Sequence, residues 1–240
     1  MACGVLANLA NGDGRCTAAV TKAGGAAAAA AALARFPGSA DIQHQGCLAL
    51  ANLASGGDGK AAAAARDAVV DAGGAAAAVR ALRKHGGVPE VRQWALGLIA
   101  NLSSGDADCK QAVADGGGAT CLAQLMAAHA DDLRLQQICC GALAHIAQED
   151  EAREAVLACA APHAMVSAMG RHMADARLQE EACFALVQLA WGGGAKGKRA
   201  AIDAGAMAAL ALVLATHTEG RHHQLQQMAR AILDELEKAR

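Results

Sequence analysis

One segment of the sequence has the spacing of a phosphate-binding loop. Residues 192–198 read Gly-Gly-Gly-Ala-Lys-Gly-Lys, which fits the pattern G-x-x-x-x-G-K, in which backbone amides and a lysine hold phosphate groups. The next residue is Arg199, where the pattern needs serine or threonine for magnesium, and the segment follows a predicted helix instead of a strand. Because residues 55–60 form a similar glycine-rich loop, we interpret residues 192–198 as a connection between helices.

Nine cysteines raise the question of a zinc site or disulfides, but no C-x-x-C pair is present. Four cysteines share one position, five residues before a recurring polar residue, namely Cys3, Cys47, Cys140 and Cys183. Buried cysteine packs as a small hydrophobe. Equivalent cysteines in stacked helices are about 10 Å apart, beyond the roughly 7 Å that a disulfide spans. We therefore predict free thiols and a reducing compartment.

Histidines and carboxylates also recur without forming a reactive group. His85, His129, His172 and His217 each end a predicted helix, where an imidazole donor meets unpaired carbonyls. The pair Asp131-Asp132 and residues 149–151 lie in predicted connections or first helical turns, where acidic side chains are favourable. No nucleophile stands beside a base, so we predict no enzyme, no metal site and no cofactor.

Composition indicates a helical protein. The chain is 54% hydrophobic, mostly alanine, which has the highest helix propensity, and only 2% aromatic. Its net charge of −2 comes from 21 basic and 23 acidic residues, so nucleic acid is not an expected partner. The most apolar stretch, residues 204–215, is shorter than the roughly 20 residues that span a bilayer. We expect no membrane insertion and a cytoplasmic location, with the nucleus as the alternative.

One helical phrase recurs six times, at residues 6–9, 50–53, 99–102, 143–146, 186–189 and 233–236. Its third residue, which we name the ladder residue, is polar in each copy. The ladder residues are Asn8, Asn52, Asn101, His145, Gln188 and Glu235, separated by 44, 49, 44, 43 and 47 residues. A period of this length indicates stacked supersecondary units.

Each unit is predicted to contain three helices, most clearly between residues 55 and 103. We expect a short helix ending near Asp71, a second from Ala75 to Lys84 and a third from Glu90 to Leu102. The pair Gly73-Gly74 predicts a turn with positive φ, and Pro162 replaces such a pair in one unit. The predicted organisation is one domain over residues 1–240, with a partial repeat at 1–10 and repeats at 11–54, 55–103, 104–147, 148–190 and 191–240.

Helical periodicity separates two faces of the third helix. Aliphatic residues such as Leu50 and Ile99 fall on one arc and are predicted to be buried. The opposite arc carries a mostly polar row, which we predict to bind the partner. Replacing Asn52, Asn101 and Gln188 together by alanine should change stability far less than replacing residues of the buried arc, although any bond to a neighbouring repeat would add a cost. The predicted partner-binding residues are His44, Leu48, Asn52, Gln93, Gly97, Asn101, Gln137, Gly141, His145, Glu180, Phe184 and Gln188.

The order of Val-Val-Asp-Ala-Gly-Gly at 69–74, a short helix and a third helix ending in Leu-Ile-Ala-Asn-Leu at 98–102 resembles the armadillo repeat of importin-alpha and beta-catenin. The resemblance covers the whole chain. It implies an all-α, right-handed superhelical solenoid of three-helix repeats, whose third helices line a concave groove for an extended peptide. Family members often place tryptophan four residues before an asparagine that grips the peptide. Here those positions hold Gly4, Leu48, Gly97, Gly141, Phe184 and Ala231, which argues against binding of nuclear localisation signals.

We therefore expect a protein–protein interaction scaffold that binds a protein or peptide, either as an extended segment or as a helix. The alternative is a structural assembly module, a fragment of a longer solenoid that stacks end to end. Val5, Leu6, Leu9 and Val20 are predicted to form an uncapped apolar end. Such an end favours self-association, because terminal repeats need a polar cap for solubility.

Overall fold

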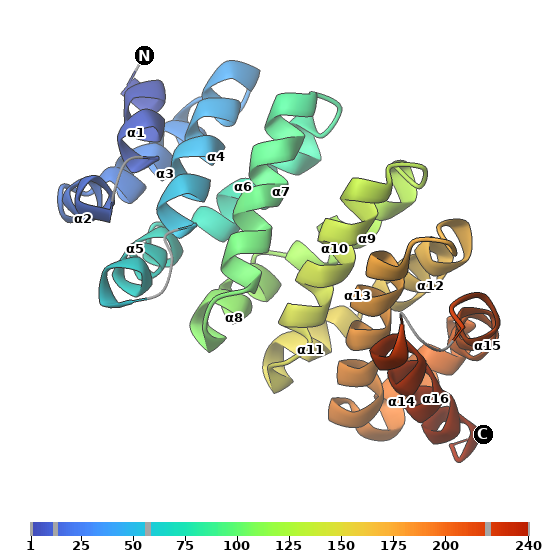
Figure 1. Ribbon diagram of the computed structural model, residues 1–240. Coiled ribbons are helices and arrows are strands. Elements are labelled where there is room, and N and C mark those ends of the chain that lie inside the picture. Colours follow the sequence, from blue (N-terminus) through green and yellow to red (C-terminus); the bar gives the residue numbers. More distant parts are fainter. Residues whose placement is uncertain (1, 12–13, 56–58, 219–221, 240) are drawn as a thin grey trace. The chain divides into compact units, whose positions relative to one another are not determined.

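The computed structural model describes residues 2–11, 14–55, 59–218 and 222–239, and every regular element in these ranges is a helix (Figure 1). The prediction of an all-α fold is confirmed. The helices form two compact units, residues 1–121 and 122–240. The single domain and the repeat boundaries taken from the sequence stay a proposal.

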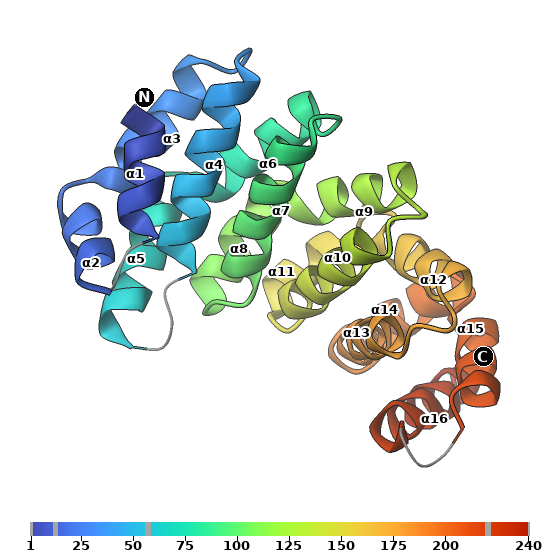
Figure 2. The same cartoon turned by 45° about the horizontal axis from the view of Figure 1, so that its top comes forward.

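The third helices of the first unit lie next to one another. Its elements are α1 (Ala2–Ala10), α2 (Gly14–Lys22), α3 (Gly25–Arg35), α4 (Ala40–Ala54), α5 (Lys60–Asp71), α6 (Gly74–His85), α7 (Pro89–Ser103) and α8 (Ala107–Asp115), and α9 (Gly118–Ala128) crosses into the second unit. Helices α1, α4 and α7 lie side by side in both views (Figures 1 and 2). They carry the recurring phrase and are the third helices of this unit.

The second unit has the same arrangement. Its elements are α10 (Leu133–Ile146), α11 (Asp150–Leu157), α12 (Ala161–Arg171), α13 (Ala176–Val187), the π-helix η1 (Gln188–Gly192), α14 (Gly194–Asp203), α15 (Ala206–Thr216) and α16 (His223–Glu237). Helices α10, α13 and α16 are its third helices, and each packs against the next.

Glycine turns separate the first and second helices, as predicted. The first glycine has positive φ in four places: Gly24 (76°), Gly73 (72°), Gly117 (78°) and Gly205 (85°). The second residue of the pair must also be small, because a Cβ on Gly74 would stand 2.6 Å from Cγ1 of Val69. Both requirements exclude larger side chains and fix the angle between the two helices.

The third helices bury the predicted arc. Leu50, Leu53, Leu98, Ile99 and Leu102 are fully buried, although Ile42 on the same arc is only half-buried. A small residue allows close approach of the second helix, since a Cβ on residue 46 would stand 2.5 Å from Cδ2 of a leucine in α3. Three third helices, α4, α10 and α13, and the first helix α8 begin at a capping side chain. The capping residues are Ser39, Asp132, Asp175 and, for α8, Asp106.

The predicted apolar end is only partly correct. Val5 and Leu9 are 56% and 46% exposed, and Leu6 is half-buried. Val20, however, is buried, because its side chain packs against Gly25 at the turn between α2 and α3.

Within the described residues, no single helix has both the length and the apolar composition needed to cross a membrane. Two strongly bent pairs reach that length and composition together, α2 with α3 (66°) and α14 with α15 (72°).

Candidate functional site

The predicted partner-binding residues lie on α4, α7, α10 and α13, with Gln188 as the first residue of η1. Each of the twelve is exposed or half-buried, and none is buried. Within the first unit the rows on α4 and α7 are neighbours, and within the second unit those on α10 and α13 are neighbours, because these helix pairs pack together. We name the surface formed by these twelve residues the third-helix face.

Two ladder asparagines tie neighbouring third helices together. Nδ2 of Asn52 donates to the carbonyl of Ala7 (2.9 Å), and Nδ2 of Asn101 donates to that of Ala51 (3.0 Å). In both cases the acceptor belongs to the residue just before the preceding ladder residue. Asn52 and Asn101 therefore make the bonds to a neighbouring repeat for which an added stability cost is expected. The bonds fix each amide in one orientation on the third-helix face.

Replacing Asn101 by alanine should lower the free energy of unfolding by about 0.5–1.5 kcal/mol, because one interhelical hydrogen bond is lost. Gln93→Ala, on the same helix and exposed, should change it by less than about 0.5 kcal/mol. Urea denaturation followed by circular dichroism measures both. Equal effects of the two substitutions would contradict the interhelical bond.

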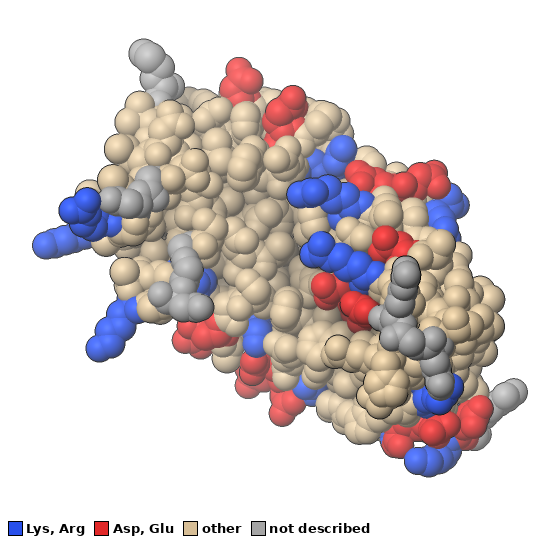
Figure 3. All heavy atoms as spheres, viewed as in Figure 1, with Lys and Arg blue, Asp and Glu red and all other residues tan. Residues whose placement is uncertain are grey.

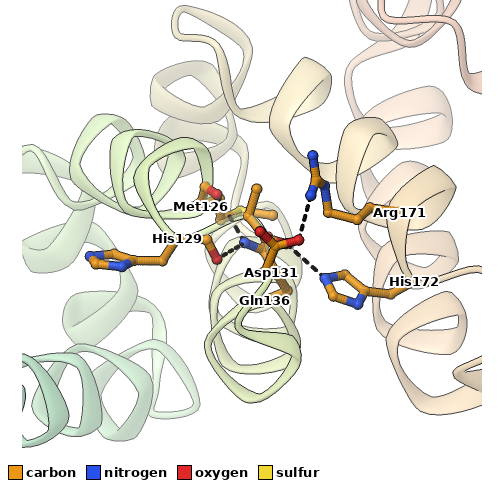
Figure 4. Close-up of polar contacts among 7 residues, drawn as sticks. Met126, His129, Asp131, Gln136, Arg171 and His172 are labelled. Carbon is orange, nitrogen blue, oxygen red and sulfur yellow. Dashed lines mark hydrogen bonds and ion pairs between the residues drawn. The ribbon is translucent and has the colours of Figure 1, made fainter.

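A second set of amides, missed in the sequence, holds each third helix to its second helix. Nε2 of Gln136 donates to the carbonyls of Met126 and His129, both at 2.9 Å (Figure 4). The Met126 carbonyl lies in the last turn of α9, where carbonyls lack intrahelical partners, and the His129 carbonyl, just beyond α9, also accepts from the backbone N–H of Asp132. Gln43, Gln179 and Gln226 make the equivalent pairs of bonds, and Arg92 takes this position in α7. All five stand nine residues before a ladder residue.

The recurring histidines bridge consecutive repeats. Nε2 of His85, His172 and His217 lies 2.8 Å from the carbonyls of Pro37, Ala130 and Met173, respectively. Since a carbonyl only accepts, Nε2 carries the proton in each bond. The predicted role at helix ends is thus corrected, because these donors satisfy carbonyls of the preceding repeat and not of their own helix.

The two units present different chemistry on this face. Over the middle of α4 and α7 the surface carries no charged group, whereas basic and acidic atoms gather over α10 and α13 (Figure 3). In the second unit, the rings of His145 and Phe184 meet edge to face with centroids 6.4 Å apart. Gln137 donates to Asp175 across the two helices (2.9 Å). These contacts orient the side chains that a partner would meet.

A carboxylate also covers part of this face. Oε2 of Glu181 would lie 3.2 Å from a Cβ on Gly141. Further along, Lys198 pairs with the ladder residue Glu235 (2.5 Å) and lowers the pKa of that carboxyl.

The segment with phosphate-loop spacing is a helix junction. It begins at the end of η1 and runs into α14, and its two lysines pair with Glu154 and Glu235. Gly197 packs directly on the carbonyl of Leu189. The π-helical turn was not predicted, and it places Gln188 outside the α-helical part of the third helix. Glycine at 197 lets α14 approach this wider turn.

All nine cysteines are free, as predicted. Burial raises the pKa of the Cys47, Cys140 and Cys183 thiols to about 12. Because folding keeps these thiols protonated, their contribution to stability is complete below pH 9.0 and is lost as the pH rises towards 12.

At about pH 8, iodoacetamide should modify only three cysteines of the folded protein, because the thiolate is the nucleophile and the other six are buried. The three are Cys3, Cys16 and Cys159. Mass spectrometry before and after unfolding counts the modified residues. Modification of Cys47 at the rate of Cys16 would contradict the assigned packing.

Comparison with solved structures identifies the fold. One neighbour is a designed armadillo repeat protein in complex with the peptide (KR)4, with TM-score 0.77, 22% identity, and coverage of 96% of this chain and 90% of that one. Another is a computationally designed armadillo repeat protein for modular peptide recognition, with TM-score 0.79, 22% identity, and coverage of 97% and 91%. The chain has the armadillo-repeat fold. Its third helices and glycine turns are those of armadillo repeats.

An engineered protein of higher sequence similarity has TM-score 0.80 and 30% identity, and this armadillo-type chain spans 55% of its length. No protein-family model matches the sequence, and the comparison with curated proteins gave no match.

Proposed function

We propose that this protein is a binding scaffold without catalysis, which holds an extended peptide or a partner helix along the third-helix face. The observation that carries the proposal is the repeated row of accessible residues, three from each of α4, α7 and α10, two from α13 and one from η1. Hydrogen bonds already fix Asn52, Asn101 and Gln137 within this row. Groups that are fixed before binding lose little entropy when a partner arrives.

The similar designed proteins support this choice. One is described as bound to a peptide, and the other as built for modular peptide recognition. Both share the fold of this chain at low identity, so they support the mode of binding and leave the ligand open.

Phe184 is the proposed anchor on this face. It is half-buried, and the edge of His145 holds its ring from one side. Large aromatic side chains dominate the affinity of many interfaces. A partner that meets the second unit should therefore place an apolar side chain against Phe184.

End-to-end assembly is the second candidate, because Val5 and Leu9 are exposed on one face of α1. Asp234 on α16 argues against this assembly. It is exposed and is the second residue of the recurring phrase, the position that Ala7 and Ala51 occupy in the first unit, where their carbonyls accept bonds from the next third helix. Burying Asp234 against an apolar face is costly.

We also propose a cytoplasmic location, which agrees with nine cysteines that form no disulfide.

Selection from a random-peptide phage library on the purified protein tests the peptide-binding proposal. Peptides that are selected should bind the Phe184→Ala variant at least about tenfold more weakly, the effect of one hot-spot side chain. Leu212→Ala is the matched control, since Leu212 is an apolar side chain on α15 that is 49% exposed. Its affinity should be unchanged.

For the first unit, Leu48→Glu on α4 is compared with Ala31→Glu, an exposed position on α3. Only the first should reduce binding of peptides that reach this unit. The proposal fails if no peptide is selected, or if the variants on the third-helix face bind as well as their controls.

A further inference from the structure

A cavity of about 340 Å³ lies between α9 and α12 in the second unit. Its lining is mostly alanine and includes Ala123, Ala130 and Ala168. Gln136 also lines it, although this side chain is only 1% exposed. Arg171 stands beside it and pairs with Asp131 (Figure 4). The cavity is therefore mainly apolar, with His163 and Ser167 also in its lining, and has a buried amide in its wall.

At the next junction, between α12 and α15, three of the positions that line the cavity with alanine hold larger side chains. One is Val166, whose Cγ1 lies 4.0 Å from the Cβ position of Gly205, the residue before α15. Unfilled volume in a protein lowers its stability. Alanine at these three positions leaves more space between α9 and α12. The residues that correspond are Ala123 and Val166, Ala130 and Met173, and Ala168 and Val213.

The amide of Gln136 offers one unused acceptor at this cavity. Its Nε2 is fully engaged by two carbonyls, and its Oε1 accepts no hydrogen bond from any residue that the structure describes. The corresponding Oε1 of Gln179, at the next junction, is sealed from solvent and has no hydrogen-bond partner among the described residues. A buried acceptor is stabilised when a donor reaches it.

We propose that this cavity binds a small, neutral, largely apolar molecule that donates one hydrogen bond to Oε1 of Gln136. Its volume lies at the lower end of ligand sites, which are about 300–1,000 Å³. A neutral ligand fits because the charge of Arg171 is already balanced by Asp131. Indole has this chemistry, with one N–H on an apolar ring system. The site lies mainly on second helices, with Gln136 contributed by α10, and Gln136 is not a residue of the third-helix face, so the inference is independent of the peptide-binding proposal.

Titration with indole, followed by the melting temperature and by saturation-transfer NMR, tests the inference. Indole at ten times its Kd should raise the melting temperature by about 3–6 °C. Benzofuran, which has the same shape without the N–H, should bind about 3–10-fold more weakly. No binding of indole, or equal binding of the two compounds, would overturn the proposal.

Variants that fill the cavity locate the site. The triple variant Ala123→Val, Ala130→Met and Ala168→Val introduces residues already present in the next junction and should abolish indole binding. Ala130→Met alone should weaken it and serves if the triple variant does not fold. Ala128→Met, exposed on α9 and outside the cavity lining, is the control and should bind as the parent does. Unchanged binding by a folded filled variant would exclude this cavity.

Discussion

Replacing Gly197 by alanine should lower the free energy of unfolding by about 3 kcal/mol or more. A Cβ at this position would overlap the carbonyl oxygen of Leu189 and lie 2.7 Å from its carbonyl carbon. Both atoms belong to the backbone of η1, so no side chain can move aside. The helix α14 must shift away from η1, and the packing between them is lost.

Gly170→Ala is the matched control, because this helical glycine in α12 has open space around its Cβ position. It should raise the free energy of unfolding by about 0.5–1 kcal/mol through helix propensity. Urea denaturation followed by circular dichroism gives both values. A neutral Gly197→Ala substitution would show that α14 does not lie on η1.

The second large effect is expected for Ile99→Ala, which should cost about 2–5 kcal/mol. Ile99 is fully buried in α7, and truncation leaves a cavity that alanine-rich neighbours cannot fill. Leu212→Ala, at an exposed position, should cost less than about 1 kcal/mol. The same denaturation experiment measures both. Similar costs for the two would contradict the assignment of the buried arc.

The sequence was sufficient to predict the helices and their faces because those depend on local pattern. Glycine pairs such as Gly73-Gly74 mark turns that only glycine adopts, and α7 begins one residue before and ends one residue after its predicted bounds. The buried arc followed from a spacing of about 100° per residue. These features need no knowledge of neighbouring repeats.

Features that depend on a neighbour were missed. The bond from Asn52 to Ala7 joins residues 45 positions apart, and nothing local distinguishes an asparagine that faces solvent from one that faces another helix. The recurrence of Gln43 and Gln136, about 20° beyond the buried arc, did indicate a shared structural role for these amides. The prediction of the buried arc rested on its aliphatic and small residues alone.

The same limit applies to the end of α13. The π-helical turn at residues 188–192 depends on the contact between α14 and Leu189, which the local sequence does not contain. The bridging histidines likewise required the position of the preceding repeat. The sequence shows that the histidines recur, but it does not show which backbone carbonyls accept their hydrogen bonds.

The central claim is that a partner lies on the third-helix face. Amide chemical-shift changes of the 24.0 kDa protein, measured by NMR during titration with a phage-selected peptide, test it most directly. We expect the largest changes at residues of this face, such as Leu48 and Gln93 in the first unit or Gln137 and Phe184 in the second. Largest changes on α6 and α12, with the third helices unaffected, would contradict it.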